Sequence, residues 1–401
     1  MSKVKCAVSA KGRLSNEARG VMPTTRRTFT DGESADGKHA ARLAVKENSQ
    51  FSAAPRSSPG RPIHTVSQLE DALSAPSDAT IEMLARLDGD VLILGAGGKM
   101  GPSLARMVRR GFESAGLARR VIAVSRFSSN GLAACLRSDG VETIAGDLLD
   151  AGFVGSLPEA ENVIYLAGMK FGTAGDAAQT WASNVYLAGQ VINRFRTSRV
   201  VALSSGNVYG LTPVDVGGGS VESDPLDPQG EYAMSVVGRE RVFEHFSRAN
   251  RTRTAIIRLN YATELRYGVL VDLAQKVFRN EPISLSMGYF NAIWQRDACD
   301  KILGSLEYAG VPPLTLNVTG AERLSCRRVC ERFGELLNRE VRFTGAESET
   351  ALLSDPRQAS KLLGPPETTF EDMAILTADW IARGGETWNK PTLFEVRDGR
   401  Y

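Results

Sequence analysis

The sequence contains few residues of the kinds that build disulfide frameworks or metal centres. Its 401 residues include five cysteines and three histidines. A small, odd number of cysteines argues against a disulfide framework and favours a reducing compartment, so we expect a cytoplasmic protein. Cys326 and Cys330 have the spacing that places two side chains on one helix face, but no histidine lies near them in the sequence. We therefore expect no metal site.

The sequence also lacks long apolar runs and an excess of charge of either sign. No segment approaches the roughly 18 consecutive apolar residues that a membrane-spanning helix needs, so we expect no membrane partner. Lysine and arginine together number 48, and aspartate and glutamate 46, which gives a formal net charge of +2. This near balance predicts no nucleic acid partner.

Residues 1–62 differ in composition from the rest of the chain. They are rich in Ser, Arg, Lys, Gly and Ala and have no sustained apolar periodicity, which predicts a disordered basic tail. Such an Arg-rich composition is compatible with an organelle transit peptide, and the alternatives are an upstream start codon or a plain disordered tail. Because the tail has no apolar central segment, we do not expect a secretory signal.

A helical lead-in is predicted at 63–88, between the tail and the first strand. Thr65 precedes an acidic and apolar run, which indicates a helix start. A second short helix is expected at about 78–87.

Strands and helices then alternate regularly. The strand expected at 90–94 contains a continuous apolar run, 91–94, and is ended by glycines, which is typical of a strand buried on both faces of a parallel sheet. The alternation predicts an α/β fold of the Rossmann type, a doubly wound parallel sheet over 89–262 with an insertion at 211–230. Amphipathic helices separated by short apolar segments predict a smaller C-terminal α/β substrate lobe over 263–401. Further strands are expected at 121–124, 141–144, 163–166, 200–203 and 254–259, and helices at 100–111, 177–195 and 232–248.

Three glycines at three-residue spacing, Gly95, Gly98 and Gly101, follow the first strand and open a helix. Such glycines allow a sharp turn, a close approach of the backbone to a pyrophosphate, and tight packing of the helix on the sheet. The free N–H groups at the helix N-terminus attract phosphates. This loop, which also contains Lys99 and Met100, predicts a bound nicotinamide dinucleotide.

The end of the second strand bears on which dinucleotide is bound. An acidic residue there would hydrogen-bond the adenosine ribose and favour NAD, but the chain has Ser125 and Arg126. Because a guanidinium can pair with a 2′-phosphate, the pattern favours NADP, with NAD as the second choice.

Several further segments follow the predicted strands and helices in a familiar order. With the glycine loop, they make the chain resemble the extended short-chain dehydrogenase/reductase family, also called the NAD-dependent epimerase/dehydratase family, over about residues 90–365. The segments are Gly146-Asp147-Leu148-Leu149-Asp150, Leu166-Ala167-Gly168, Asn184-Val185, Ser204-Ser205-Gly206-Asn207-Val208-Tyr209-Gly210 and Arg258-Leu259-Asn260.

The resemblance implies roles for the residues around the cofactor. It implies that Asp147 contacts the adenine, with Leu148 beside it, and that Leu166, Ala167 and Gly168 pass alongside the cofactor.

The resemblance also implies the reaction and the substrate. The substrate would be a small molecule, such as a sugar, a sugar nucleotide or a similar polyhydroxylated compound. Hydride transfer would epimerise, dehydrate or reduce it, while Ser205 hydrogen-bonds the reacting oxygen and Tyr232 relays its proton. A homodimer is implied, formed by the helices at 177–195 and 232–248, whose apolar faces include Val185, Val191 and Val242. Candidate substrate-binding residues are Asn207, Glu231, Arg258 and Asn260.

One departure from the family pattern concerns catalysis. The family pairs its tyrosine with a lysine four residues later, and Val236 stands at that position. A nearby ammonium lowers the pKa of a phenol, which valine cannot do. Either Lys170 or Arg239 supplies the missing charge, with Lys170 our first candidate, or the site carries out a different reaction. The remaining alternative is a non-catalytic dinucleotide-binding regulator or scaffold.

Overall fold

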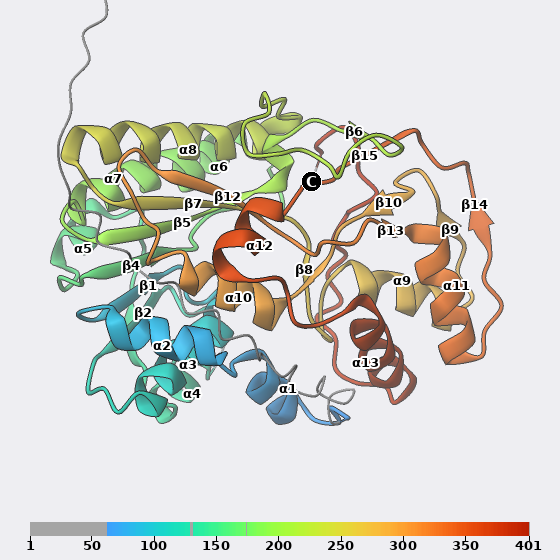
Figure 1. Cartoon of the computed structure of the whole chain (residues 1–401), viewed down its shortest axis with the longest axis horizontal. Helices are drawn as coiled ribbons and strands as arrows, with labels where there is room; N and C mark the ends of the chain where they lie inside the picture. The colour runs from blue at the N-terminus through green and yellow to red at the C-terminus, as the bar shows by residue number, and fades with distance from the viewer. Residues whose placement is uncertain (1–61, 129–130, 174, 401) are drawn as a thin grey trace, which may run out of the picture. The chain divides into compact units, whose positions relative to one another are not determined.

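The structure is a computed structural model that describes residues 62–128, 131–173 and 175–400. All but the last residue of the predicted basic tail lies outside the described residues. At the centre is a seven-stranded sheet in the order β12-β7-β5-β4-β1-β2-β3 (Figure 1), with parallel pairings between all neighbours. The predicted doubly wound α/β fold is confirmed. The strands are β1 (Val91–Leu94), β2 (Val121–Ser125), β3 (Glu142–Ala145), β4 (Asn162–Tyr165), β5 (Arg199–Ser205), β7 (Thr254–Leu259) and β12 (Leu314–Val318).

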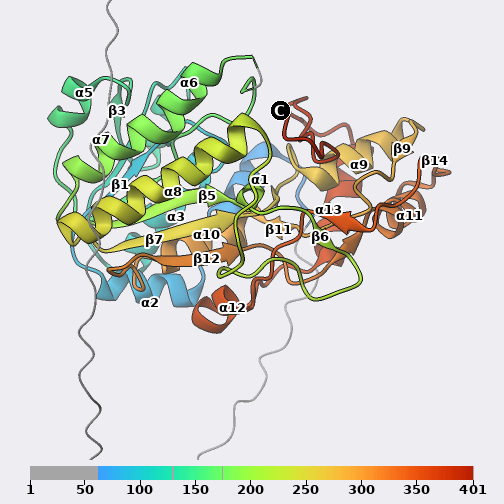
Figure 2. The same ribbon diagram turned by 90° about the horizontal axis from the view of Figure 1, so that it is seen from above.

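Helices cover both faces of the sheet, and two of them, α7 and α8, lie over it in Figure 2. In β1, Val91 and Ile93 pack into the core on one face, and Leu92 and Leu94 into the core on the other. Burial on both faces explains why the strand is apolar without alternation. The first core includes side chains of α2 (Asp78–Arg86), α3 (Gly101–Ser114), α4 (Leu132–Ser138) and α10 (Gln295–Gly304). The second includes side chains of α5 (Ala151–Ser156), α7 (Leu187–Arg194) and α8 (Gly230–Asn250).

The long helix predicted at 177–195 is interrupted by a π-helical turn. α6 (Ala177–Trp181) leads into the turn at Ala182–Tyr186, and α7 follows it. The turn contains buried Asn184, whose side-chain amide exchanges hydrogen bonds of 2.9 Å with the backbone of Met169 and donates to Ser235 at 2.8 Å. The irregular turn thus points a polar side chain at the loop after β4, a placement common at functional sites.

The C-terminal part of the chain returns to the main sheet. The segment 314–318 was expected in the C-terminal lobe, but the structure places it as β12 at the sheet edge, where it runs parallel to β7. α10 also packs against the sheet rather than in the lobe. Sequence periodicity could not show this, because a short apolar run reads alike in a small lobe and at a sheet edge.

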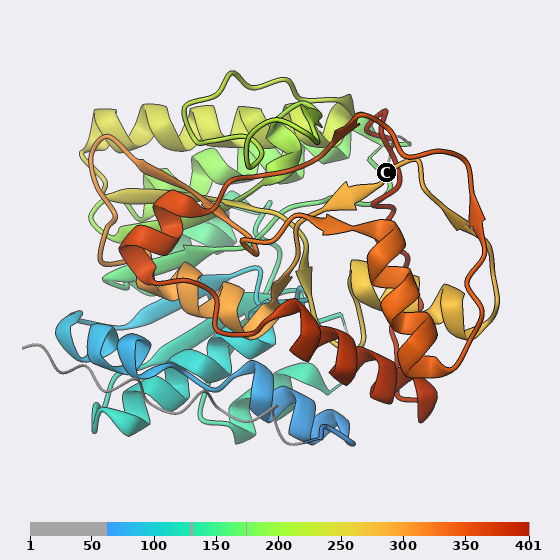
Figure 3. The same ribbon diagram turned by 45° about the vertical axis from the view of Figure 1, so that its right-hand side comes forward.

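The remaining C-terminal elements pack around a core of their own, which we call the C-terminal lobe (Figure 3). It is built on three helices, α9 (Val269–Phe278), α11 (Cys326–Leu337) and α13 (Phe370–Ala382). Cys326 and Cys330 are buried in it as free thiols. α12 (Arg357–Leu363) packs instead on β12 and α10, in the sheet core. The remaining short elements are β6 (Thr212–Pro213), β8 (Ala262–Thr263), β9 (Ile283–Ser284), β10 (Tyr289–Phe290), β11 (Ile293–Trp294), β13 (Leu324–Ser325), β14 (Phe343–Thr344) and β15 (Thr350–Ala351).

Both helices of the predicted lead-in are present. α1 (Val66–Leu73) begins at Thr65, which forms a capping box with Gln68. α1 packs on the C-terminal lobe, whereas α2 packs on the sheet core. Glu70 of α1 pairs with Arg106 of α3 and with Arg266, which precedes α9. The lead-in therefore joins the Rossmann part to the C-terminal lobe.

A buried ion pair joins the elements that carry the expected catalytic residues. Arg258 of β7 pairs with Glu240 of α8 at 2.8 Å, and both side chains are at least 95% buried. Glu240 also accepts a hydrogen bond from Ser204 of β5. Arg258 donates to the hydroxyl of Tyr209 at 2.7 Å. One charge pair thus ties α8 to β5 and β7.

The same network reaches β12 and the insertion at 211–230. The Tyr209 hydroxyl donates to Asn317 of β12 at 2.8 Å, and the Asn317 amide donates to the carbonyl of Ser220 at 2.9 Å. The carboxylate of Glu222 accepts from the Asn317 backbone N–H at 2.8 Å. These contacts hold the insertion against the sheet edge.

The valines proposed for a dimer contact are partly used within the chain. Val191 is fully buried in the core beneath α7, so it does not belong to an outer face, contrary to the expectation. Val185 packs on Gly238 of α8, and Val242 lies beside Gly189 of α7. Large exposed side chains on these helices are instead Trp181, Tyr186 and Met234.

We predict that Arg258→Met lowers the free energy of unfolding by about 3–5 kcal/mol, because it leaves the Glu240 carboxylate buried without a cation. Arg258→Met combined with Glu240→Leu should recover part of this loss. Urea unfolding followed by circular dichroism measures both. The matched control is Arg86→Met, which breaks the exposed pair Arg86–Glu307 and should change little. An equal loss in Arg258→Met and Arg86→Met would contradict the role of the buried pair.

Candidate active site

The candidate site lies at the carboxyl ends of β1 and β4, where the strand order of the sheet reverses. β1 pairs with β2 on one side and with β4 on the other. The strands that follow β1 and those that follow β4 are therefore added in opposite directions along the sheet. Ligands of open α/β sheets bind in such a crevice. Gly95 follows β1 and donates to the carbonyl of Val124 at 2.9 Å, and Leu166 follows β4 and donates to that of Leu94 at 2.8 Å.

The glycine loop is packed too tightly for side chains at two positions. Gly95 has a φ of +87°, and a Cβ there would lie 2.6 Å from the backbone nitrogen of Ala167. A Cβ on Gly101 would lie 2.3 Å from the carbonyl oxygen of Ala96. The first glycine thus permits the turn against the β4 loop, and the last permits α3 to start directly on the loop.

The start of α3 offers free backbone donors. Its N-cap is Met100, and no side chain caps the first turn. The first N–H groups of a helix have no partners within it, so they remain available to an anion. Gly98, Lys99, Met100 and Gly101 all line the cavity in front of this helix. Tight glycines together with an uncapped helix start fit a dinucleotide pyrophosphate.

The cavity encloses about 360 Å³ and brings together residues from both halves of the chain. The predicted site residues that line it are Gly95, Gly98, Lys99, Met100, Gly101, Leu166, Gly168, Lys170, Ser205, Asn207, Tyr232 and Asn260. The predicted residues that do not line it are Ser125, Arg126, Asp147, Leu148, Ala167, Glu231 and Arg258.

Four of the residues outside the lining lie at or after the ends of β2 and β3. Ser125 ends β2 and lies beside the glycine loop, since a Cβ on Gly97 would be 2.5 Å from its hydroxyl oxygen. Arg126 is exposed, Asp147 accepts from the backbone N–H of Leu149 at 3.0 Å, and Leu148 is buried in the core.

The other residues outside the lining have contacts of their own. Ala167 is the close neighbour of Gly95. Glu231 accepts a hydrogen bond from the Trp181 indole at 2.6 Å. The guanidinium of Arg258 is engaged in the buried network, and these contacts favour a structural role over substrate binding.

Three expected catalytic residues meet in the cavity. Ser205 is the last residue of β5, and its hydroxyl donates to the side-chain oxygen of Asn207 at 2.9 Å. Tyr232 lies in the first turn of α8 and is half-buried. The Lys170 ammonium, in the loop after β4, is 5.8 Å from the centre of the Tyr232 ring. Burial lowers the pKa of Lys170 to about 8.

The position of the absent lysine is filled by an apolar contact. Val236 is fully buried against Val208 and Tyr209. Arg239, one turn further along α8, lines the cavity, but its guanidinium is bound to protein oxygens. It donates to the carbonyl of Leu203 at 2.9 Å, and to the carbonyl of Asn184 at 3.2 Å as well as to its side-chain oxygen.

The cavity also contains residues that were not predicted from the sequence, most of them from the C-terminal part of the chain. Among them, Thr392 is held by Asp272, whose carboxylate accepts from its backbone N–H at 2.8 Å and its hydroxyl at 2.6 Å. No motif marks such positions, because they reach the cavity only through the packing of the C-terminal segment on α9. The missed lining residues include Tyr261, Tyr267, Gln295 and Thr392.

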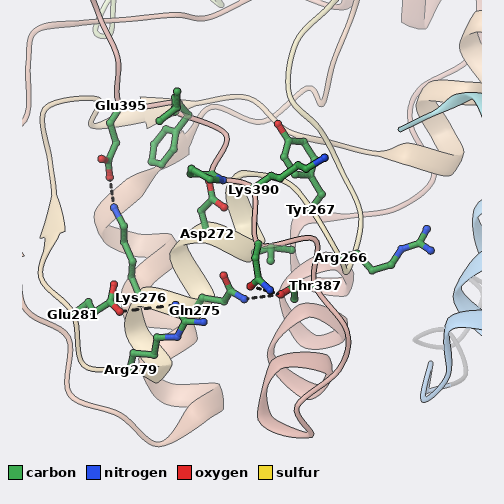
Figure 4. A pocket seen from close by; sticks show the side chains of 15 residues that line it. Arg266, Tyr267, Asp272, Gln275, Lys276, Arg279, Glu281, Thr387, Lys390 and Glu395 are labelled. Atoms are coloured by element: carbon green, nitrogen blue, oxygen red, sulfur yellow. Dashed lines mark hydrogen bonds and ion pairs between the residues drawn. The ribbon is translucent and has the colours of Figure 1, made fainter. Parts of the chain in front are cut away.

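A second cavity, of about 290 Å³, lies in the C-terminal lobe and shares Tyr267 with the first (Figure 4). Most of its cations are matched by nearby carboxylates. Lys276 pairs with Glu395 at 2.7 Å, and Arg279 lies 3.9 Å from Glu281. Balanced charges of this kind suit a solvated groove better than an anion site.

In the described part of the chain, no helix combines the length and the apolar character needed to cross a membrane. Among the same residues, no three His, Cys, Asp or Glu side chains come together as metal ligands do.

The fold is similar to those of several solved structures. The dTDP-glucose 4,6-dehydratase DesIV of Streptomyces venezuelae, with NAD bound, is 19% identical, with 73% of this chain and 96% of that chain covered and a TM-score of 0.62. MoeE5 in complex with UDP-glucose and NAD is 21% identical, with 74% and 99% covered and a TM-score of 0.61. A UDP-glucuronic acid 4-epimerase of Bacillus cereus, with NAD, is 15% identical, with 73% and 98% covered and a TM-score of 0.60. At these identities the likeness concerns the fold.

The Rossmann part also resembles a known family in its sequence. None of the curated proteins matches the chain. Residues 91–262 match the NAD dependent epimerase/dehydratase family. This segment runs from β1 to β8 and includes the glycine loop, Ser205 and Tyr232. The likeness to this family is therefore a property of residues 91–262, and the family match does not cover the rest of the chain.

Proposed function

We propose that the chain is an NAD(P)-dependent enzyme that epimerises, dehydrates or reduces a sugar nucleotide or a similar polyhydroxylated compound by hydride transfer. The observation that carries the proposal is that Ser205, Tyr232 and Lys170 line the same cavity as the glycine loop. A bound nicotinamide supplies a hydride acceptor or donor in such a cavity. The solved structures of similar fold include proteins bound to UDP-glucose or named for dTDP-glucose, which supports this substrate class.

In the proposed mechanism, Ser205 and Tyr232 act on one substrate oxygen. The Ser205 hydroxyl, now bonded to Asn207, turns to donate to that oxygen and fixes its position. The Tyr232 hydroxyl relays the proton that leaves or joins the oxygen as hydride moves at the carbon. Asn260, which is buried and lines the cavity, is placed to bind a neighbouring substrate hydroxyl.

Lys170 supplies the positive charge that the absent lysine would provide. Its ammonium faces the Tyr232 ring across the cavity. Arg239 is less suited, because its guanidinium is bound to Asn184 and Leu203 and serves to hold α8 against the π-helical turn. An ammonium near the phenol stabilises the phenolate form that accepts a proton.

We further propose that the cofactor is NADP, because no acidic residue stands at the end of β2 and Arg126 is exposed there. We also propose a homodimer through α6, α7 and α8, with exposed Trp181, Tyr186 and Met234 in the contact.

A panel of sugar nucleotides tests the reaction. The full chain, incubated with NADP or NAD and each compound, should convert at least one of them to an epimer, a dehydrated product or a reduced product, detected by NMR. The presence of Val236 favours one other function, a non-catalytic dinucleotide-binding regulator. Tight binding of dinucleotide without conversion of any compound would favour the regulator.

We predict that the activity falls as the pH rises through about 8, where Lys170 loses its charge. The sign follows from burial, which disfavours the ammonium, so the required cation is lost at a lower pH than for a free lysine. Lys170→Arg should move this fall to higher pH, and Lys170→Met should lower kcat by about 100-fold or more. Lys361→Met, at an exposed lysine of α12 that lines neither cavity, is the control. Full activity in Lys170→Met would exclude Lys170.

We predict that Arg126→Ala weakens NADP binding by about 10-fold, because one charged contact to the 2′-phosphate is lost, while NAD binding changes little. Isothermal titration calorimetry with both dinucleotides measures this. Tighter binding of NAD than of NADP by the unmodified chain would contradict the NADP assignment.

A further inference from the structure

The candidate active-site cavity is unusual in its charge. Three cations line it, Lys99, Lys170 and Arg239, and no carboxylate stands among the described lining residues. The acidic groups that act on Lys99, Asp272 and Glu264, are engaged elsewhere. Asp272 accepts from the backbone and hydroxyl of Thr392. Glu264 pairs with Arg266 outside the lining. The cavity is therefore cationic before any ligand enters.

Two of the three cations already have a task. Arg239 holds Asn184 and the end of β5, and Lys170 faces Tyr232. The side chain of Lys99 has neither task. It leaves the glycine loop and crosses to the C-terminal part, where its ammonium lies 3.0 Å from the centre of the Tyr267 ring and 4.8 Å from that of Phe171.

The position of Lys99 sets it apart from the cofactor phosphates. The phosphates are expected at the backbone N–H groups that open α3. Lys99 comes just before this helix, so only its backbone is expected to lie near the phosphates. Its ammonium lies instead beside Tyr267, in the loop before α9, on the wall that the C-terminal part contributes. A charge on this wall faces the substrate side of the cavity.

The surroundings of Lys99 favour the binding of an anionic ligand. Burial, followed by repulsion from Lys170 and Lys390, lowers the pKa of Lys99 to about 7, and Asp272 and Glu264 oppose this only weakly. Lys390 and Tyr267 both line the second cavity (Figure 4). An anion placed next to Lys99 would offset this repulsion and favour the charged form of the lysine.

Building on the proposed function, we propose that the reacting sugar carries an anionic group, a carboxylate or a phosphate, and that Lys99 binds this group beside Tyr267 and Phe171. A lysine suits this role because its compact ammonium pairs with either kind of anion. The site would thereby select charged sugars over neutral ones of the same shape.

Competitive labelling tests the proposal without requiring turnover. The full chain loaded with dinucleotide is treated with an amine-acylating reagent, and modification of Lys99 is followed by mass spectrometry. Glucuronate or glucose 6-phosphate should slow the labelling of Lys99 several-fold, whereas glucose should not. The pattern distinguishes a carboxylate from a phosphate. Lys361, exposed on α12, is the internal control and should label equally throughout. Equal protection by glucose, or no protection by either anion, would overturn the proposal.

A second experiment separates this proposal from the proposed function. UDP-glucuronic acid and UDP-glucose differ only in a carboxylate in place of a hydroxymethyl group. Lys99→Met should reduce kcat/KM for UDP-glucuronic acid by about 10- to 100-fold more than for UDP-glucose. An equal reduction for both would refute the role of Lys99 while leaving the enzyme assignment intact. If anions protect Lys99 but no compound is converted, the enzyme assignment is refuted, while the binding of anions by Lys99 stands.

Discussion

The buried pair between Arg258 and Glu240 is the constraint on which the active-site geometry depends. Tyr232 and Ser205 lie on different elements, α8 and β5, so their relative position depends on how these two elements pack. Glu240 lies two turns along α8 from Tyr232 and bonds Ser204, the neighbour of Ser205, while pairing with Arg258. A buried charge needs its partner in place, so α8 has little freedom to shift along the sheet.

This constraint explains which parts of the molecule the sequence could predict. The strands and the glycine loop follow from local patterns, namely apolar runs and glycine spacing. Ser205 and Tyr232 were expected at the site only because the segments that contain them resemble the family. Arg258 was expected to bind substrate, because the motif that contains it does not indicate that it has a buried partner. That partner, Glu240, comes from an element earlier in the chain, and only packing brings the two together. The position of β12 in the main sheet and of Thr392 in the cavity could not be predicted for the same reason.

The absence of a lysine at Val236 is matched by a rearranged set of cations. Val236 completes a small apolar cluster with Val208 and Tyr209, where a lysine would be buried among apolar groups. Positive charge enters the cavity instead from the loop after β4, at Lys170, and from the glycine loop, at Lys99. In the proposed mechanism, Lys170 keeps the charge that proton transfer needs, and Lys99 adds a second charge on the proposed substrate side.

The central claim is that this cavity carries out hydride transfer with Tyr232 as the proton relay. Rapid mixing of the dinucleotide-loaded chain with UDP-glucuronic acid tests it most directly, with the absorbance of reduced nicotinamide as the signal. We predict a change in this absorbance in a single turnover, and its loss in Tyr232→Phe with dinucleotide binding retained. Binding of both ligands without any change in absorbance or any product would contradict the claim.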